Sequence, residues 1–355
     1  MKDKLKLLHI EDDEDYVTIF QRKMREISRR ENDAELVFET AGLTSIALSM
    51  VESKKYDCIV TDHQLGNEFG LEFLKSFRQN DILTPVIFVT GQGDEQVARD
   101  ASLNGANDYF SKDISFFSFD KIYYSIIQHV NSSKDKMTLK LIQDFMSSIN
   151  LSSTAGEIYG AIYDYFPKLF PCESLIVSSY DTEKKLIKAD FAIHDGTIVD
   201  TAKMPILNLE ADSGEGMQST VLRTGEPLLI PDITEFTKKR CRQNYIIESN
   251  GTYTEFSGER DNENSQSMMI VPMKSHGVVV GAIQIQSKKS EAYDVHDLNI
   301  LISLIRPLEV AIKHAYMSSE NLDFLKELRS MLSQGPKEKD LKAVVDRIDE
   351  RISMS

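Results

Sequence analysis

The first 130 residues alternate short apolar runs of β-strand type with helix-like segments, and chemically special side chains stand where four of these runs end. The positions are Glu11-Asp12 after the run 5–10, Asp62 after 58–61, Thr90 after 86–89, and Lys112 shortly after 107–110. In an open parallel α/β sheet, ligands bind at the carboxyl ends of the strands. The pattern therefore predicts a parallel sheet that gathers these side chains at one edge.

Three acidic residues of this set predict a magnesium site. Mg²⁺ prefers oxygen ligands in octahedral geometry and is usually held by one or two carboxylates plus phosphate. We expect Asp12 and Asp62 to bind the ion directly, with Glu11 nearby or acting through a water molecule. The main-chain carbonyl of Gln64 is a further expected ligand.

Asp62 is also the expected phosphoryl acceptor. A carboxylate can attack a phosphoryl group and hold it as an acyl phosphate, and such catalysis consists mostly of positioning and electrostatic stabilisation. Lys112 is expected to pair with one phosphoryl oxygen, and the hydroxyl of Thr90 to donate to another. An acidic residue after a strand is by itself more often a helix cap, so the prediction depends on the whole set.

Four strings within residues 4–130 resemble the response-regulator receiver domain: 9–13 (HIEDD), 60–65 (VTDHQL), 88–91 (FVTG) and 105–112 (GANDYFSK). The resemblance implies an α/β fold, the flavodoxin-like (βα)5 receiver. It also implies Mg²⁺-dependent phosphorylation of Asp62, with a histidine kinase or phosphotransfer protein as phosphoryl donor. In the implied switch, Thr90 moves toward the phosphate and Tyr109 changes rotamer.

Two residues depart from the family's pattern. Asp113 stands where proline usually follows the lysine, and we expect a trans bond there because a non-proline cis bond costs about 2.5–4 kcal/mol. Gly66 replaces another common proline, which we expect to loosen its loop without touching a catalytic atom. Asp13 leaves open which adjacent acids form the metal pair, although the strand end favours Glu11 and Asp12.

Two glutamines are candidates for setting the lifetime of the acyl phosphate. Gln64 lies two residues after Asp62, and Gln92 lies two residues after Thr90. In receivers these positions flank the path of the attacking water. We therefore hypothesise that both side chains tune dephosphorylation.

Length and charge bound the rest of the chain. Its 355 residues suffice for two domains and connecting helices. A formal charge of −15 argues against a nucleic-acid surface, which needs clustered lysine and arginine, and the basic cluster 238–242 is interpreted as a solvated face. Three distant cysteines and no apolar run of about 20 residues predict a cytoplasmic protein without a membrane span. The expected parts are a receiver over 1–131, a helical linker over 132–149, a second domain over 150–316 and a helical hairpin over 317–355.

The linker is expected to begin at a polar joint, residues 131–136, after a receiver helix over 115–129. Beyond the joint, apolar residues recur at three- and four-residue steps, which is typical of a helix. They are Met137, Leu141, Phe145, Met146 and Ile149. This stripe indicates packing within its own domain or, alternatively, a parallel dimer seam that carries a signal between domains.

Residues 150–316 mix helices and strands in a different order. The expected elements are a helix over 155–170 ended by Pro167 or Pro171, strands at 174–180 and 185–193, a helix at 218–224, a strand at 228–230, a polar loop over 250–266, a hairpin of 267–273 and 278–286 about a turn at 275–277, and a final helix over 295–316. Strands and helices in this arrangement predict an α+β domain.

The strings 216–227 (GMQSTVLRTGEP), 229–232 (LIPD), 269–273 (MIVPM) and 281–285 (GAIQI) resemble a GAF domain. The resemblance implies a six-stranded antiparallel sheet with helices on one face and, often, a small-molecule pocket on the other. Of the pattern typical of cyclic-nucleotide GAF domains, only Lys288 and Asp297 match. The ligand therefore stays unknown, and a pocket filled by its own side chains and used for dimerisation is an alternative.

The tail contains two apolar stripes at helical spacing, one of leucines over 322–332 and one of leucine, valine and isoleucine over 341–352. Gly335-Pro336 lies between them, which predicts a helical hairpin. No ATP-binding, helix-turn-helix or hydrolase pattern accompanies it, so we expect no enzyme beyond phosphorylation and dephosphorylation of the receiver itself. The leading interpretation is a homodimeric two-component response regulator, signalling through its GAF domain and helices rather than through DNA binding. The alternative is a small-molecule sensor, or a kinase-docking phosphate sink, that the receiver modulates.

Overall fold

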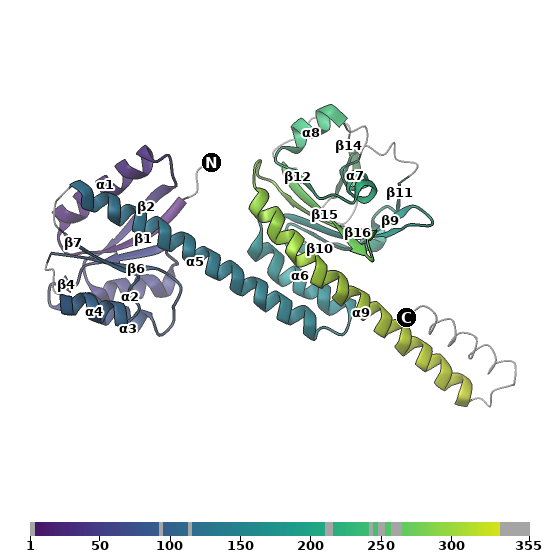
Figure 1. Ribbon diagram of the computed structural model, residues 1–355, viewed down its shortest axis with the longest axis horizontal. Coiled ribbons are helices and arrows are strands. Elements are labelled where there is room, and N and C mark those ends of the chain that lie inside the picture. The colour runs from purple at the N-terminus through teal and green to yellow at the C-terminus, as the bar shows by residue number, and fades with distance from the viewer. Residues whose placement is uncertain are drawn as a thin grey trace. The chain divides into compact units, whose positions relative to one another are not determined.

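The structure is a computed structural model that describes residues 4–91, 95–112, 116–209, 216–240, 244–247, 253–256 and 265–333. It divides into two compact units, one ending at Lys140 and the other beginning at Leu141. Each unit is a β-sheet with helices packed on it (Figure 1). Among the described helices, none is both long and apolar enough to cross a membrane.

The first unit is built on a parallel sheet whose five strands lie in the order β2-β1-β3-β6-β7. This order is that of the flavodoxin-like fold, which confirms the expected (βα)5 architecture. The strands are β1 (Lys4–Ile10), β2 (Glu35–Ala41), β3 (Cys58–Thr61), β6 (Val86–Thr90) and β7 (Asp108–Ser111). A short hairpin of β4 (Gln64–Leu65) and β5 (Glu68–Phe69) follows β3.

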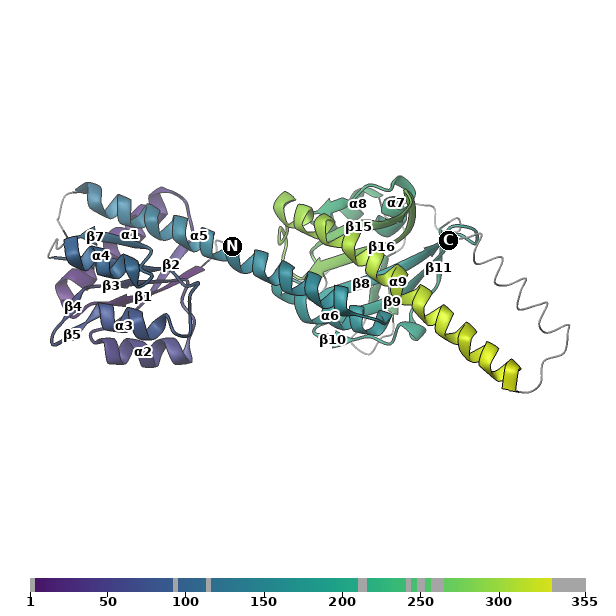
Figure 2. The same cartoon turned by 60° about the horizontal axis from the view of Figure 1, so that its bottom comes forward.

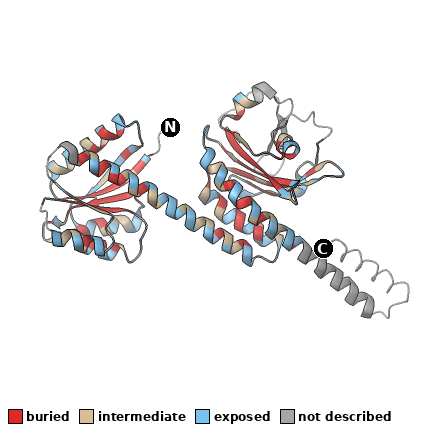
Figure 3. Cartoon of the chain, in the orientation of Figure 1, coloured by how far each residue is buried: buried red, intermediate tan, exposed pale blue. Residues whose placement is uncertain are grey.

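Helices cover both faces of this sheet. They are α1 (Glu14–Arg30), α2 (Thr44–Ser53), α3 (Gly70–Phe77), α4 (Glu95–Leu103) and the first part of α5 (Phe116–Leu151). Alternate residues of β1 point to opposite faces. Leu7 joins the buried cluster against α1 and α5, whereas Leu8 and Ile10 join the cluster against α2 and α3. The three central strands, β1, β3 and β6, are accordingly buried along most or all of their length, whereas the edge strands β2 and β7 are largely half-buried or exposed (Figure 3).

Helix α5 runs without interruption from Phe116 to Leu151, so the expected polar joint at residues 131–136 is wrong. That stretch contains no proline or glycine, and every residue in it is exposed or half-buried. Its polarity reflects a helix face that borders water rather than a break in the helix. Val130 belongs to the core of the first unit and Phe145 to that of the second, so α5 contributes to both.

The second unit contains an antiparallel sheet, as the GAF resemblance implied, and among the described residues it has seven strands where six were expected. Six strands follow the path β10-β9-β8-β16-β15-β12, and β11 pairs with β9 beside this path. The strands are β8 (Ser174–Asp181), β9 (Leu186–His194), β10 (Thr197–Ile198), β11 (Leu207–Asn208), β12 (Leu228–Ile230), β15 (Ser267–Ser275) and β16 (Val278–Ser287). Between β15 and β16, His276 and Gly277 have φ values of 50° and 83°, the backbone that a two-residue type I′ turn requires.

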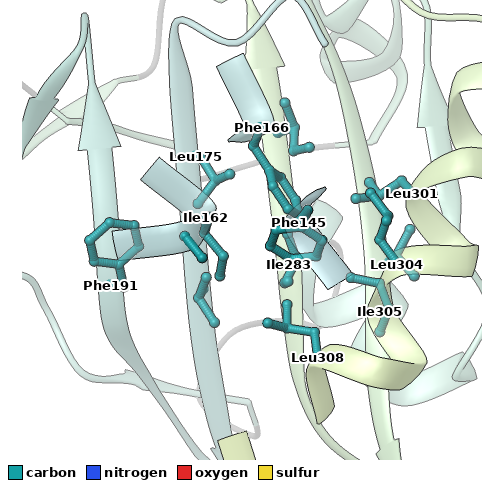
Figure 4. Close-up of a cluster of buried hydrophobic side chains, with 14 of the residues drawn as sticks. Phe145, Ile162, Phe166, Leu175, Phe191, Ile283, Leu301, Leu304, Ile305 and Leu308 are labelled. Carbon is teal, nitrogen blue, oxygen red and sulfur yellow. The ribbon is translucent and has the colours of Figure 1, made fainter. Parts of the chain in front are cut away.

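Three helices cover one face of this sheet: the end of α5, α6 (Ala155–Leu169) and α9 (Val295–Ser333). Figure 4 shows their side chains, among them Phe145, Phe166 and Leu304, packed against Leu175 and Ile283 of the strands. Helix α6 ends before Pro171 and contains Pro167, so of the two prolines only the later one lies beyond its end. This cluster is the main core of the unit.

The opposite face carries α7 (Met217–Thr224) and α8 (Ile233–Arg240), as both Figure 1 and Figure 2 show. The resemblance implied helices on one face and, often, a small-molecule pocket on the other, and in the structure this second face also carries helices. Val221 and Leu222 of α7 and Ile233 of α8 form a second buried cluster with Ile270 and Ala282 of the sheet. Apolar side chains on both faces of β15 and β16 require cover on both sides, and these two helices supply it.

Three segments of the second unit differ from the elements predicted for them. The predicted polar loop over 250–266 contains β14 (Tyr253–Phe256), which pairs with β13 (Asn244–Ile247). A 3-10 turn, η1 (Thr201–Lys203), was not expected. Helix α9 continues past the expected end at residue 316, whereas the second half of the predicted hairpin and the turn at Gly335-Pro336 lie outside the described residues.

Candidate functional site

Backbone pairing brings two acidic residues to the carboxyl edge of the first sheet. The amide of Asp62 donates to the carbonyl of Ile10 at 3.0 Å, and the amide of Glu11 donates to the carbonyl of Ala41 at 2.9 Å. The ends of β1, β2 and β3 are thereby aligned. The carboxylates that follow β1 and β3 lie side by side, as the positions in the sequence predicted.

Glu11, Asp12 and Asp62 form an acidic cluster, with one carboxylate oxygen from each lying within 4.8 Å of the others. Glu11 and Asp62 are buried, at 3% and 8% exposed, whereas Asp12 is exposed. Hard oxygen ligands on one side and access to water on the other suit Mg²⁺, which keeps several water ligands. The three carboxylates are therefore suitable ligands for a metal ion.

Lys112 reaches this cluster from the far side of β6. Its Nζ lies 2.6 Å from Oδ2 of Asp62 and 2.6 Å from Oε2 of Glu11. Its backbone amide donates to the carbonyl of Thr90 at 2.7 Å, so the ends of β6 and β7 are tied together. One ammonium therefore bridges two buried carboxylates, with the buried Thr90 placed at the neighbouring strand end.

Burial and charge oppose each other at this cluster. Burial raises the pKa of Glu11, while the hydrogen bond and charge of Lys112 lower it and the nearby Asp62 raises it further, with a net upward direction. Burial alone would lower the pKa of Lys112, but hydrogen bonds to Asp62 and Glu11 raise it overall. The ammonium is therefore held charged where a second cation would also be favoured.

Asp13, the third consecutive acid, does not join the cluster. Its Oδ1 accepts hydrogen bonds from the amides of Asp15 at 3.0 Å and Tyr16 at 3.1 Å, which makes it the N-cap of α1. Carboxylates are favoured at this position because they satisfy free amides of the first turn. The adjacent acids that remain at the cluster are Glu11 and Asp12.

Gly66 contacts the cluster directly, which corrects the expectation that it touches no catalytic atom. Its amide donates to Oδ2 of Asp12 at 2.9 Å, and its φ is +61°. Proline has no N–H and is restricted to a φ near −65°, so neither feature is available to the residue common in this family. The glycine thus orients an acidic side chain of the cluster.

Gly70 was missed from the sequence. A Cβ at this residue would lie 2.2 Å from the carbonyl oxygen of Asp62 and 2.9 Å from Oγ1 of Thr61. Only glycine allows the start of α3 to approach the backbone of the candidate phosphoryl acceptor this closely. The signal that was available is a glycine eight residues after Asp62, where a residue without a Cβ needs a reason.

Two ring-bearing residues near this cluster, His9 and Tyr16, were also missed. His9 is 1% exposed, its Nδ1 has no hydrogen-bond partner among the described residues, and its ring centroid lies 4.5 Å from that of Phe20. Burial, and then the charge of Lys112, lowers the pKa of His9 to about 3. The ring centroid of Tyr16 lies 4.5 Å from Nζ of Lys112. The ammonium is therefore bordered by the ring of Tyr16 as well as by carboxylates.

The remaining predicted residues have different outcomes. Tyr109 is half-buried in β7 and packs against the cluster of apolar residues under α2 and α3. Gln64 is exposed in β4, two residues beyond Asp62. Gln92 and the expected trans bond at Asp113 lie outside the described residues.

In the second unit, the partial cyclic-nucleotide pattern does not form a pair. Nζ of Lys288 lies 2.8 Å from Oδ2 of Asp195, in the turn between β9 and β10. Oδ2 of Asp297 instead accepts a hydrogen bond from the amide of Asp294 at 3.1 Å, at the start of α9. Lys288 and Asp297 thus each bind another residue, and no ion pair joins them in the described part of the chain.

Comparison with known families agrees with these two folds. Residues 8–122 match the family model of the response regulator receiver domain, and residues 168–312 match the family model of the GAF domain. The chain therefore carries a response regulator receiver domain followed by a GAF domain, as the two resemblances implied.

Individual relatives each match only part of this chain. The chain is 31% identical over 111 residues to the alkaline phosphatase synthesis transcriptional regulatory protein PhoP of Bacillus subtilis, a match that covers 31% of this chain and only 43% of that regulator. The receiver domain of the Francisella response regulator 1452 is similar with a TM-score of 0.32 and 22% identity, over 36% of this chain and 98% of that one. A GAF domain of an Acinetobacter phosphoenolpyruvate-protein phosphotransferase is similar with a TM-score of 0.40 and 16% identity, over 51% and 95%.

Proposed function

Because a receiver domain precedes a GAF domain in this chain, we propose that the protein is a two-component response regulator phosphorylated on Asp62. The observation that carries the proposal is the bridge from Lys112 to both Asp62 and Glu11, at 2.6 Å each. A nucleophilic carboxylate held beside an ammonium and further acids is the arrangement that phosphoryl transfer to aspartate needs.

In the proposed reaction, an oxygen of Asp62 attacks phosphorus while the bond from phosphorus to the donor's leaving atom breaks. The leaving atom keeps the electron pair of that bond. The ammonium of Lys112 then pairs with one oxygen of the transferred phosphoryl group. The hydroxyl of Thr90, at the end of β6, donates a hydrogen bond to another of its oxygens. Glu11, Asp12, Asp62 and the carbonyl of Gln64 would hold Mg²⁺, which when bound neutralises charge on the phosphoryl oxygens.

We assign the phosphoryl donor to a histidine kinase or phosphotransfer protein, since a receiver domain implies such a partner. After transfer, movement of Thr90 toward the phosphate and a new rotamer of Tyr109 would signal the change. Gln64 and Gln92 would tune loss of the phosphate. Free thiols at Cys58 and Cys172 fit a cytoplasmic location.

The output is proposed to leave through the GAF domain and the helices, by a change in a homodimer, and not through DNA. A formal charge of −15 supports the last part, because DNA binding needs clustered cations. Met137, on the predicted apolar stripe of α5, is 45% exposed, which leaves it accessible to a second copy.

Light scattering with a phosphoryl mimic tests this function. Full-length protein is treated with Mg²⁺ and beryllofluoride, and its molar mass and hydrodynamic radius are compared with those of untreated protein. Wild type should change in mass or radius, whereas Asp62→Asn should not respond. An identical response from the two proteins would remove Asp62 from its assigned role.

A further inference from the structure

We propose that Tyr16 is a positioning residue of the phosphoryl-accepting site, and that its aromatic face fixes the ammonium of Lys112. The inference rests on the proposed function, because it assigns a role in the same reaction. It concerns a residue of α1 that lies outside the set of acids, Thr90 and Lys112 identified from the sequence.

The Tyr16 ring is the third neighbour of the Lys112 ammonium, beside two carboxylates. Nζ of Lys112 lies 4.5 Å from the ring centroid of Tyr16 and 2.6 Å from each of its two carboxylate partners, Asp62 and Glu11. An ammonium has three N–H donors and no acceptor. Two carboxylates and a π face therefore bound the group on three sides, and the Lys112 side chain keeps only 16% of its exposure.

The ring is itself held in place from two directions. The backbone amide of Tyr16 donates to the Asp13 side chain at 3.1 Å, which fixes the first turn of α1. The ring lies against those of His9 and Phe20, with centroid distances of 6.4 Å and 6.1 Å and tilted planes. A side chain restrained at both its backbone and its ring is a firm surface for the ammonium.

The physical effect is to keep Lys112 near the acceptor while its partners change. A cation over an aromatic ring is attracted by the ring's quadrupole, and the attraction grows when the site is desolvated. Burial and the charges of Glu11 and Asp62 raise the pKa of the Tyr16 hydroxyl, so the ring stays neutral. The attraction needs the ring face and not the hydroxyl, which makes phenylalanine the conservative replacement.

The test measures the initial rate of phosphorylation of full-length protein by acetyl phosphate with Mg²⁺, using intact mass. Tyr16→Leu should lower the rate between about two-fold and thirty-fold, the range that a cation–π contact of this kind spans. Tyr16→Phe should stay within about two-fold of wild type, because it retains the π face. Tyr124→Leu changes an exposed tyrosine of α5 and serves as the matched control.

A spectroscopic measurement on unphosphorylated protein keeps this proposal separate from the function on which it rests. In lysine-labelled protein, the Lys112 Cε resonance, assigned with Lys112→Arg, should carry a ring-current shift in wild type and Tyr16→Phe and lose it in Tyr16→Leu. If the shift is absent in wild type, or if the Leu variant reacts as fast as wild type, the proposal is overturned. A Phe variant as slow as the Leu variant would equally overturn it, since the hydroxyl would then be the active part. Failure of wild type to be phosphorylated at all would instead contradict the proposed function.

Discussion

Lys112 and Asp62 form an ion pair of 2.6 Å although the strands that precede them, β7 and β3, are not neighbours in the sheet. Strand β6 lies between them and ends at Thr90. The lysine side chain therefore crosses the end of β6 to reach the acceptor. The site therefore draws on the ends of three neighbouring strands, with Thr90 at the end of the middle one.

Removal of the ammonium should weaken the first unit and strengthen its response to metal. Lys112→Met leaves Glu11 and Asp62 buried without their shared cation, which should cost about 1–3 kcal/mol in EDTA. Added Mg²⁺ should recover more stability in Lys112→Met than in wild type. A ligand that binds the folded state stabilises it by mass action, and in this variant the Lys112 ammonium no longer competes with Mg²⁺ for the carboxylates. Hydrogen exchange of the β1 and β3 amides, with and without Mg²⁺, measures both effects.

Lys112→Arg is the control for this experiment, since it keeps the charge and should lose little protection in EDTA. Equal protection of wild type and Lys112→Met in EDTA would speak against the bridging role of the ammonium. So would a smaller gain from Mg²⁺ in the methionine variant.

Substitution of Gly66 should separate its two contributions. Gly66→Ala keeps the N–H that binds Asp12 but places a Cβ at a φ of +61°, and should destabilise by about 1 kcal/mol. Gly66→Pro can adopt neither this φ nor the hydrogen bond, and should be less stable than Gly66→Ala. Urea unfolding measures the order, with Gly42→Ala, where a Cβ meets ordinary van der Waals space, as the control. A proline variant as stable as wild type would show that the loop does not depend on this contact.

Acid should weaken the first sheet through Glu39. Hydrogen bonds from Lys54, then from Tyr56 and Lys6, lower the pKa of Glu39 to about 2. A carboxyl whose folded pKa lies below its unfolded value stabilises above the unfolded value, and that stability is lost as pH falls toward the folded one. Wild type should exceed Glu39→Gln by up to about 1 kcal/mol at pH 7, since partly exposed ion pairs are weak.

The difference between wild type and Glu39→Gln should shrink between pH 5 and pH 2, roughly the interval between the unfolded and folded pKa values. Chemical denaturation across this range is the measurement. Glu35→Gln, at a more exposed residue of β2, is the control. A gap that stays constant down to pH 2 would contradict the assigned network.

The continuity of α5 is testable by hydrogen exchange. Amides of residues 131–136 lie inside a helix that runs from Phe116 to Leu151, so each is hydrogen-bonded to the preceding turn. Their protection should be similar to that of residues 125–130. Exchange at the rate of an unstructured chain over 131–136 would restore the polar joint that the composition predicted.

The fold of the first unit could be predicted because each of its signals is local. An apolar run sets each strand, and the rule for parallel sheets then places Asp62, Glu11 and Lys112 at one edge. The contacts of Gly66 and Gly70 could not be predicted, since they depend on how a loop approaches another strand. The Tyr16 contact was hidden for the same reason, because nothing in a helical sequence states which residue its first turn will face.

The errors have a common physical origin. Polar residues at 131–136 resembled a joint because composition reports exposure to water, and a solvated helix has the same composition as a linker. Within the predicted loop over 250–266, β14 depends on pairing with β13, which is a contact rather than a local preference. Apolar patterns identified the β15–β16 hairpin but could not indicate that α7 and α8 cover its second face.

The most direct test of the account is whether Asp62 accepts a phosphoryl group. Full-length protein is incubated with acetyl phosphate and Mg²⁺, and intact mass and borohydride trapping identify the modified residue. Wild type should gain one phosphoryl group, trapped at Asp62, and should gain none in EDTA. Asp62→Asn should gain none under either condition. Equal modification of wild type and Asp62→Asn, or no modification of wild type, would contradict the central assignment.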